Sequence, residues 1–247
     1  MNVALCISGL VRTLDQCVES MSKYLIEPTG ADVFVNVWEE DPNKEKVSLL
    51  KPVVVNVAKM PNWNMDRNDR IPIANNPMFF GISMCNVLRQ NYERKNDMQY
   101  DWVIRARADE MFYEGIEDLN TLDRKFMYFP NFNNYYGLND RFAFSSPELM
   151  DIYCGALGYN INNHYADYEF DRHAGRFFDR VTKKTIYMAS EFALAKWLVM
   201  HNVEIRRTKV IYEIIRLPGS RGSVGMPIIG DKPDIGWEEL KERYKES

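Results

Sequence analysis

The start of the chain alternates between strand and helix patterns, and this feature constrains the fold most. Residues 3–7 form a continuous apolar run that stops at Ser8-Gly9, as in a central parallel strand that enters a loop. A stripe at helical spacing follows and consists of Leu14, Cys17, Val18, Met21 and Leu25. Residues 31–38 return to a strand pattern. Strand, helix and strand in this order predict an α/β fold with a mixed, mostly parallel sheet flanked by helices.

The rest of the chain continues with the same two patterns. The predicted strands cover residues 53–57, 100–108, 126–129, 141–145 and 203–215. The predicted helices cover residues 78–92, 146–157, 190–201 and 237–244. Residues 62–77 have the composition of a loop, and the segment from residue 217 is rich in glycine and proline. We therefore expect one domain over residues 1–216 and a C-terminal extension, residues 217–247, that packs on it.

Composition argues against several classes of protein. The net charge of −4 and the pI near 5.6 disfavour a nucleic-acid-binding surface. The four cysteines form no CxxC pair and only three histidines are present, so we expect buried thiols and no zinc site. No window approaches the roughly 18 apolar residues of a membrane helix, and residues 1–10 carry no basic leader. We expect a soluble, cytoplasmic protein without a membrane span; the sequence leaves the oligomeric state open.

The loop after the first strand has the features of an anion site. Ser8 and Gly9 let a ligand approach backbone N–H groups, and the N-terminus of the next helix favours negative charge. Arg12 adds a cation for a charge-assisted contact. Thr13 with Gln16 predicts a capping box at the start of that helix. A plain tight turn with a surface arginine is the alternative interpretation.

The strand over residues 100–108 ends in charged side chains. Alternation gives it one face with Trp102, Ile104, Ala106 and Ala108, and a second face with Val103, Arg105, Arg107 and Asp109. Charges on one face of a central strand are destabilising unless they are paired. They form either a salt-bridge network or a site for an anion and a cation, in which Asp109 ligates a hard divalent ion. Glu110 points the other way on an extended chain and is the weaker ligand.

Several of these segments together resemble the GT-A class of nucleotide-sugar glycosyltransferases. The resemblance is carried by residues 7–13, 32–38, 101–109 and 139–144, and it covers roughly residues 1–201. Within that class the chain is similar to small, soluble enzymes found in surface-polysaccharide gene sets and in large algal (chlorella) viruses. The resemblance implies a GT-A-like, Rossmann-related catalytic domain over residues 1–216, which for a viral protein would work in the host cytoplasm.

The resemblance also implies a donor site. In the GT-A class an Asp-x-Asp motif binds Mn²⁺ or Mg²⁺ together with the donor diphosphate. Asp109 matches the last acid of this motif and is the predicted metal ligand. Arg107 stands where the first acid would be, and it could neutralise a phosphate directly. The residues expected to bind the nucleotide-sugar donor are Ser8, Gly9, Arg12, Arg105, Arg107 and Asn139.

The acceptor half of the site is expected further along the chain. Asn139 and Asp140 follow a glycine turn, and the resemblance implies contact with the donor sugar or an acceptor hydroxyl; a local Asx-turn is the alternative. Glu191 resembles the acidic position at which inverting enzymes keep their base, and an ordinary first-turn helix acid is the alternative. Asp140 and Glu191 are the candidate catalytic residues. The aromatic, polar segment 158–179 is expected to bind the acceptor rather than a metal.

These features lead to one functional expectation and two alternatives. The resemblance implies a metal-assisted transfer of a sugar from a nucleoside-diphosphate donor, with a UDP-sugar favoured, to a glycan hydroxyl. The expected partners are therefore a nucleotide sugar and a glycan acceptor. A nucleotidyltransferase with the same acid–metal pair is the first alternative. A non-catalytic glycan-binding or scaffold protein that retains the fold is the second.

Overall fold

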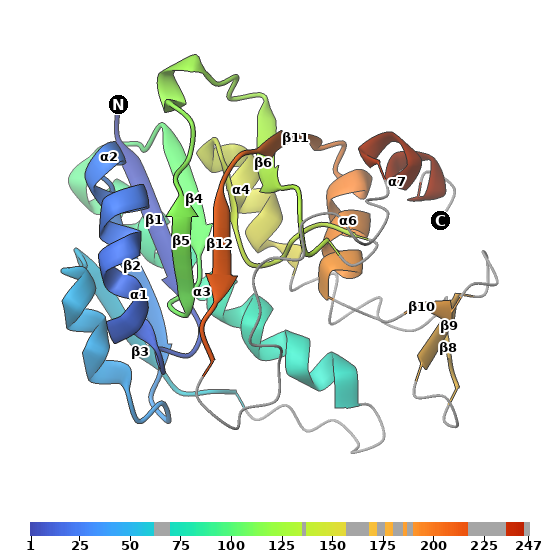
Figure 1. Cartoon of the computed structure of the whole chain (residues 1–247), viewed down its shortest axis with the longest axis horizontal. Coiled ribbons are helices and arrows are strands. Elements are labelled where there is room, and N and C mark those ends of the chain that lie inside the picture. The colour runs from blue at the N-terminus through green and yellow to red at the C-terminus, as the bar shows by residue number, and fades with distance from the viewer. Residues whose placement is uncertain are drawn as a thin grey trace.

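A seven-stranded sheet forms the centre of the protein (Figure 1). The computed structural model describes residues 1–61, 70–134, 137–156, 168–171, 176–179, 185–186, 190–216 and 236–244. The strand order is β11-β6-β7-β4-β1-β2-β3. Its strands are β1 (Val3–Ser8), β2 (Asp32–Trp38), β3 (Val54–Ala58), β4 (Trp102–Ala106), β6 (Phe126–Pro130), β7 (Ala143–Ser145) and β11 (Glu204–Thr208). Strand β7 is antiparallel to both neighbours and the other neighbouring pairs are parallel, which confirms the mixed, mostly parallel sheet.

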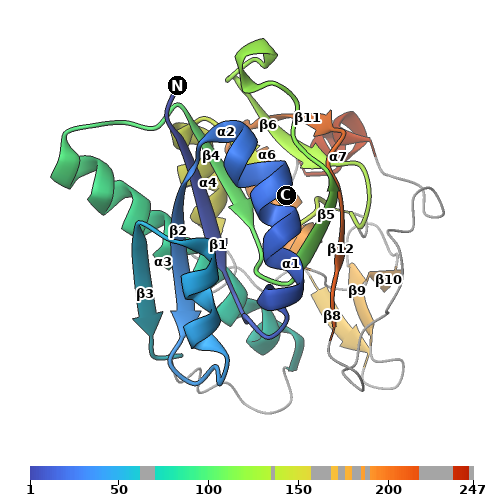
Figure 2. The same ribbon diagram turned by 60° about the vertical axis from the view of Figure 1, so that its left-hand side comes forward.

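Helices cover both faces of this sheet, so its central strands β1, β2 and β4 are buried on both sides. The first face carries α1 (Leu14–Met21), η1 (Ser22–Ile26), α2 (Glu27–Thr29) and η2 (Lys44–Leu50). The second face carries α3 (Arg70–Asn96), α4 (Pro147–Cys154) and α6 (Ser190–Met200). In β1, alternate residues serve the two cores: Leu5 packs in the core under α1, whereas Ala4 and Cys6 pack in the core under α3. Figure 2 shows α1 in front of the sheet, with α4 and α6 behind it.

Two smaller sheets and two further helices complete the described structure. A two-stranded antiparallel ribbon of β5 (Glu110–Glu114) and β12 (Ile211–Ile214) lies on the α1 side of the main sheet (Figures 1 and 2). The other elements are β8 (Tyr168–Asp171), β9 (Arg176–Asp179), β10 (Thr185–Ile186), η3 (Leu119–Thr121) and α7 (Trp237–Tyr244). Helix α7 packs against α6 through Leu240, which is fully buried.

Two general properties can be read from the described residues. All four cysteines are buried and form no disulfide, as predicted. Within the described part of the chain, none of the helices combines the length and apolar content needed to cross a lipid bilayer.

The largest difference from the predicted elements lies in α3. The sequence predicts a loop over residues 62–77 and a helix from residue 78, whereas α3 begins at Arg70 and continues to Asn96. Pro72 lies in the first turn, where backbone N–H groups lack helical partners in any case. Pro77 is inside the helix and removes one donor, but the packing of Phe79 and its neighbours on the sheet holds the helix together.

Two further predictions are wrong in ways that shape the site. The predicted strand over residues 100–108 ends at Ala106, and the chain turns back into β5. The turn is stabilised by the side chain of Glu110, whose Oε2 accepts a 2.9 Å hydrogen bond from the Arg107 N–H. The predicted capping box is also absent: the Thr13 hydroxyl makes no cap bond and donates instead to the Ile215 carbonyl at 3.0 Å.

The core around β7 gives a direct test of the fold. Phe144 is fully buried, and its ring stacks on Tyr128 at a centroid distance of 4.9 Å. We expect Phe144→Ala to lower the free energy of unfolding by about 3–5 kcal/mol, because the lost packing leaves a cavity. Urea unfolding would measure this change. Val57→Ala, at a half-exposed position on edge strand β3, is the control and should change stability by less than about 1 kcal/mol.

Candidate functional site

The candidate site lies where the strand order of the sheet reverses. The chain leaves β1 towards β2 on one side, and it leaves β4 towards β6 and β7 on the other. The loops that follow β1 and β4 therefore diverge at the carboxyl ends of two adjacent strands. In open α/β sheets this topological switch point is where ligands bind. Arg12 lies in the first of these loops, and Arg107 and Asp109 lie in the second.

The loop after β1 has a conformation that requires glycine. Gly9 has a φ of +123°, which side-chain-bearing residues rarely adopt, and a Cβ added there would meet no atom within 4 Å. Ser8 is buried at the end of β1. The backbone N–H of Val11 is already used, since it donates to Asp41 at 2.8 Å. Asp41 therefore fixes the backbone of the loop at Val11, next to Arg12.

Three arginines surround one buried carboxylate at this edge, and we call them the arginine cluster. Arg107 holds both oxygens of Asp109, with Nε at 2.7 Å from Oδ1 and Nη2 at 2.8 Å from Oδ2. Nη2 of Arg12 lies 3.5 Å from Oδ2, and Nη1 of Arg216 lies 3.8 Å from the same oxygen. The Asp109 side chain is 1% exposed, whereas the three arginine side chains are each about one-fifth exposed. The arginines therefore form the solvent-facing layer.

The electrostatics of the cluster are dominated by positive charge. Burial alone would raise the pKa of Asp109, but Arg107, Arg216 and Arg12 together hold it below its usual value. Burial lowers the pKa of Arg216; Asp109 opposes this, and repulsion from Arg107, Arg12 and Arg141 adds to the lowering. Three guanidinium groups share one carboxylate in a chain whose net charge is −4. Such a local excess of positive charge is suited to an anion.

The arginine cluster does not fit the Mn²⁺ or Mg²⁺ ion that the family resemblance implies. Both oxygens of Asp109 accept hydrogen bonds from Arg107, and two more guanidinium groups lie within 4 Å of Oδ2. A hard divalent cation requires several free oxygen ligands. Across the residues described, no group of three histidine, cysteine, aspartate or glutamate side chains is placed to hold a metal. In this arrangement Asp109 is a counter-ion to arginines, and metal dependence stays a prediction.

Arg105 lies apart from the arginine cluster, although the sequence places it on the same face. It is buried on β4, and Nη1 donates to the Arg141 carbonyl. Its charge also lowers the pKa of Glu110, which burial raises more strongly, to about 8. Glu110 is fully buried, and its Oε1 has no hydrogen-bond partner in the described part of the chain. Arg105 and Glu110 thus form a buried layer beneath the cluster.

Asn139 holds the shape of the loop before β7. Its Oδ1 accepts hydrogen bonds from the Arg141 N–H at 2.9 Å, the Phe142 N–H at 3.2 Å and the Tyr212 hydroxyl at 2.9 Å. Its Nδ2 donates to the Phe132 carbonyl at 3.0 Å, and the residue is fully buried. These bonds match the Asx-turn alternative. The predicted contact between Asn139 and a donor or acceptor stays a prediction, without support from this geometry.

Asp140 and Glu191 lie together, and we call them the acid pair. The Ser190 hydroxyl joins them: it donates to Oδ2 of Asp140 and lies 3.5 Å from Oε2 of Glu191. Burial raises the pKa of Glu191 well above its usual value, and the neighbouring charge of Asp140 raises it further. Glu191 also lies in the first turn of α6. A carboxyl group whose pKa is raised in this way binds a proton more strongly than an ordinary glutamate, as expected of a group that takes part in acid–base chemistry.

Arg141 connects the acid pair with the arginine cluster. Its Nε lies 3.9 Å from Oδ1 of Asp140. Burial acts to lower the pKa of Arg141, but Asp140, Tyr212 and Glu191 raise it overall, and Arg107 opposes them. Arg141 is therefore within electrostatic reach of both groups. The two predicted halves of the site thus lie beside each other.

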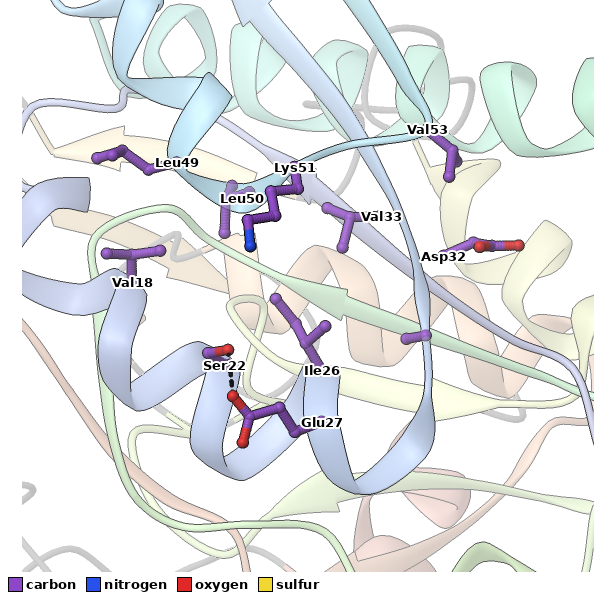
Figure 3. A pocket seen from close by; sticks show the side chains of 11 residues that line it. Val18, Ser22, Ile26, Glu27, Asp32, Val33, Leu49, Leu50, Lys51 and Val53 are labelled. Atoms are coloured by element: carbon purple, nitrogen blue, oxygen red, sulfur yellow. Dashed lines mark hydrogen bonds between the residues drawn. The ribbon is translucent and has the colours of Figure 1, made fainter.

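A groove elsewhere on the protein is separate from this site (Figure 3). It has a volume of about 380 Å³ and lies between the η1–α2 segment and η2. Ser22 and Glu27 border it and share a 2.9 Å hydrogen bond. Asp32 and Val33, which also line it, begin β2, so the groove lies at the amino end of the parallel strands. The candidate site is at their carboxyl end.

Sequence reasoning brought most of these side chains into one site and missed others. Arg12 and Asp109 meet as expected from their places after β1 and β4. Arg216 was missed because nothing in the local pattern shows that β12 returns to the β4–β5 turn. The sequence pattern at Ser190 indicates only the start of a helix and gives no sign that its hydroxyl contacts Asp140. The side chains of the predicted acceptor-binding segment 158–179 lie outside the described residues.

Comparison with known proteins identifies one similar family. A search of curated proteins finds no match to this chain. Residues 77–154 match a family model described as a domain of unknown function, DUF7796. The match begins inside α3 and ends with α4, so it includes Arg107, Asp109 and Asp140. About one-third of the chain, containing β4, the turn after it and part of the acid pair, is thus similar to the DUF7796 family.

Proposed function

We propose that the protein is a glycosyltransferase that moves a sugar from a nucleoside-diphosphate donor to a glycan hydroxyl. The observation that carries this proposal is that Arg141 links the acid pair to the arginine cluster at the topological switch point of the sheet. A positive, partly exposed cluster suits a diphosphate. An adjacent carboxylate with a raised pKa suits removal of a proton from a hydroxyl. The family resemblance supports the same assignment and favours a UDP-sugar.

The two groups would have complementary roles in the transfer. The acceptor oxygen attacks the anomeric carbon, and the bond between that carbon and the diphosphate oxygen breaks. Negative charge develops on the departing diphosphate, where the fixed guanidinium groups of the arginine cluster stabilise it. The hydroxyl proton passes to Glu191, which must be ionised at that moment. Asp140 and Ser190 would hold Glu191 in place through the shared hydroxyl.

Nucleotide binding provides the first test of this proposal. Calorimetry with UDP, GDP and CDP, each with and without Mn²⁺, should show binding of at least one nucleotide, with UDP expected to bind best. The corresponding nucleotide sugars should be slowly hydrolysed, since water can replace the acceptor. Absence of binding to all three nucleotides would contradict the proposal. Binding without hydrolysis or transfer, even with glycan acceptors present, would instead support a non-catalytic glycan-binding or scaffold protein.

A further inference from the structure

We propose that the donor diphosphate binds directly to Arg12, Arg107 and Arg216, with Asp109 as their buried counter-ion, and that binding requires no divalent metal. This inference rests on the proposed function, because it specifies how that site holds its donor. It departs from the metal-bridged diphosphate that the family resemblance implies. The arginine cluster supplies the positive charge that a metal would otherwise bring.

Asp109 contacts Arg107 closely, whereas Arg12 and Arg216 are more distant from it. Arg107 binds both carboxylate oxygens at hydrogen-bond distance, a bidentate arrangement that fixes both side chains. Arg12 and Arg216 approach only Oδ2, at 3.5 and 3.8 Å. Nε of Arg12 is buried and has no hydrogen-bond partner among the described residues. Arg12 and Arg216 therefore keep donor capacity for a second anion.

Hydrogen bonds connect the backbone segments that carry the three arginines. The Ile215 N–H donates to the Asp109 carbonyl at 2.9 Å, and the Ile215 carbonyl accepts the Thr13 hydroxyl at 3.0 Å. Ile215 precedes Arg216, and Thr13 follows Arg12. Three segments that are distant in sequence are thus connected next to the residues that carry the positive charge. A site organised before binding loses less conformational entropy when the ligand arrives.

The balance of charge favours an anion over a cation. A divalent cation at Asp109 would meet three guanidinium groups that lie within 4 Å of the carboxylate. The same groups attract each oxygen of a diphosphate. Arg216 is destabilised in its charged form by burial and by the other arginines, which an incoming anion would relieve. The three guanidinium groups are therefore placed to bind a ligand with several negative charges.

Inorganic pyrophosphate in the presence of EDTA is the probe for this inference. Calorimetry should show binding without metal. Arg12→Ala and Arg216→Ala should each weaken it about tenfold or more, since each removes charge-assisted hydrogen bonds. Arg124→Ala is the matched control, because Arg124 is half-exposed near the amino end of β4 and pairs with Asp101; it should bind as the unmodified protein does.

Asp109→Asn separates the arginine and metal interpretations by the sign of its effect. If Asp109 is a counter-ion, this variant should bind pyrophosphate as tightly as the unmodified protein or severalfold more tightly, because a competing charge is removed. If Asp109 is a metal ligand, the unmodified protein should bind pyrophosphate only with Mn²⁺, and Asp109→Asn should lose that binding. Circular dichroism would verify that the variant is folded; if it is not, the two arginine variants in EDTA decide alone. Binding that appears only with Mn²⁺, or arginine variants with unchanged affinity, would overturn the inference.

Two experimental outcomes distinguish the metal-free arginine site from the glycosyltransferase activity. Pyrophosphate binding in EDTA without hydrolysis of any nucleotide sugar would keep the arginine site and reject the glycosyltransferase. Nucleotide-sugar hydrolysis that stops in EDTA and returns with Mn²⁺ would keep the glycosyltransferase and reject the metal-free site.

Discussion

Replacement of Glu191 by glutamine should reduce sugar transfer by about 10²- to 10⁴-fold while nucleotide affinity stays the same. Glutamine has nearly the shape of glutamate and can still contact the Ser190 hydroxyl, but it cannot accept a proton from the acceptor. Glu191 lies outside the contacts of the arginine cluster, so donor binding should not depend on its charge. Steady-state transfer rates and nucleotide calorimetry on the same preparation would measure both effects.

A matched variant and a pH profile make this test specific. Glu204→Gln changes an exposed glutamate on β11 that pairs with Lys241, and it should leave transfer unaltered. Because burial and Asp140 raise the pKa of Glu191, the fraction that is ionised grows as pH rises, so kcat/KM should increase with pH through that pKa. Asp140→Asn removes the neighbouring charge and should move this rise to lower pH. Transfer that survives in Glu191→Gln would place the base elsewhere.

The sequence predicts the central sheet well because its strands carry strong local patterns. The run over residues 3–7 is apolar on both faces and the run over residues 31–38 is largely apolar, and the structure buries both under helices on the two sides of the sheet. The meeting of Arg12 and Asp109 follows from one topological rule about strand ends. The start of α3 could not be predicted in this way, because Pro72 and Pro77 point to a loop and the packing that outweighs them is tertiary.

The details of the site depend on contacts that no local pattern encodes. The alternation that groups Arg105 with Arg107 and Asp109 stops at Ala106, where the chain turns into β5. Arg216 joins the site only because β12 pairs with β5, about 100 residues earlier in the chain. The environment of Asp109 is likewise set by three separate segments. An acid in a metal-binding motif and an acid that neutralises arginines look the same in sequence, and only the arrangement of neighbours separates them.

Glu110→Gln should change how the stability of the protein depends on pH. Burial raises the pKa of Glu110 from its usual 4.5 to about 8 in the folded protein, although Arg105 and Arg107 oppose the shift. The folded state therefore holds this proton more tightly than the unfolded state does. The resulting stabilisation is fully present below pH 4.5 and is lost as pH rises through 8.

The size of this effect follows from the shift of the pKa. Each unit is worth about 1.4 kcal/mol, so the Glu110 contribution to the free energy of unfolding should fall by roughly 3–5 kcal/mol over that pH range. Glutamine cannot ionise, so Glu110→Gln should lack this part of the fall and become the more stable protein at pH 8.5. Urea unfolding at several pH values would measure the difference, with exposed Glu114→Gln on the same strand as the control. Parallel curves for Glu110→Gln and the unmodified protein would show that burial does not hold the proton on Glu110.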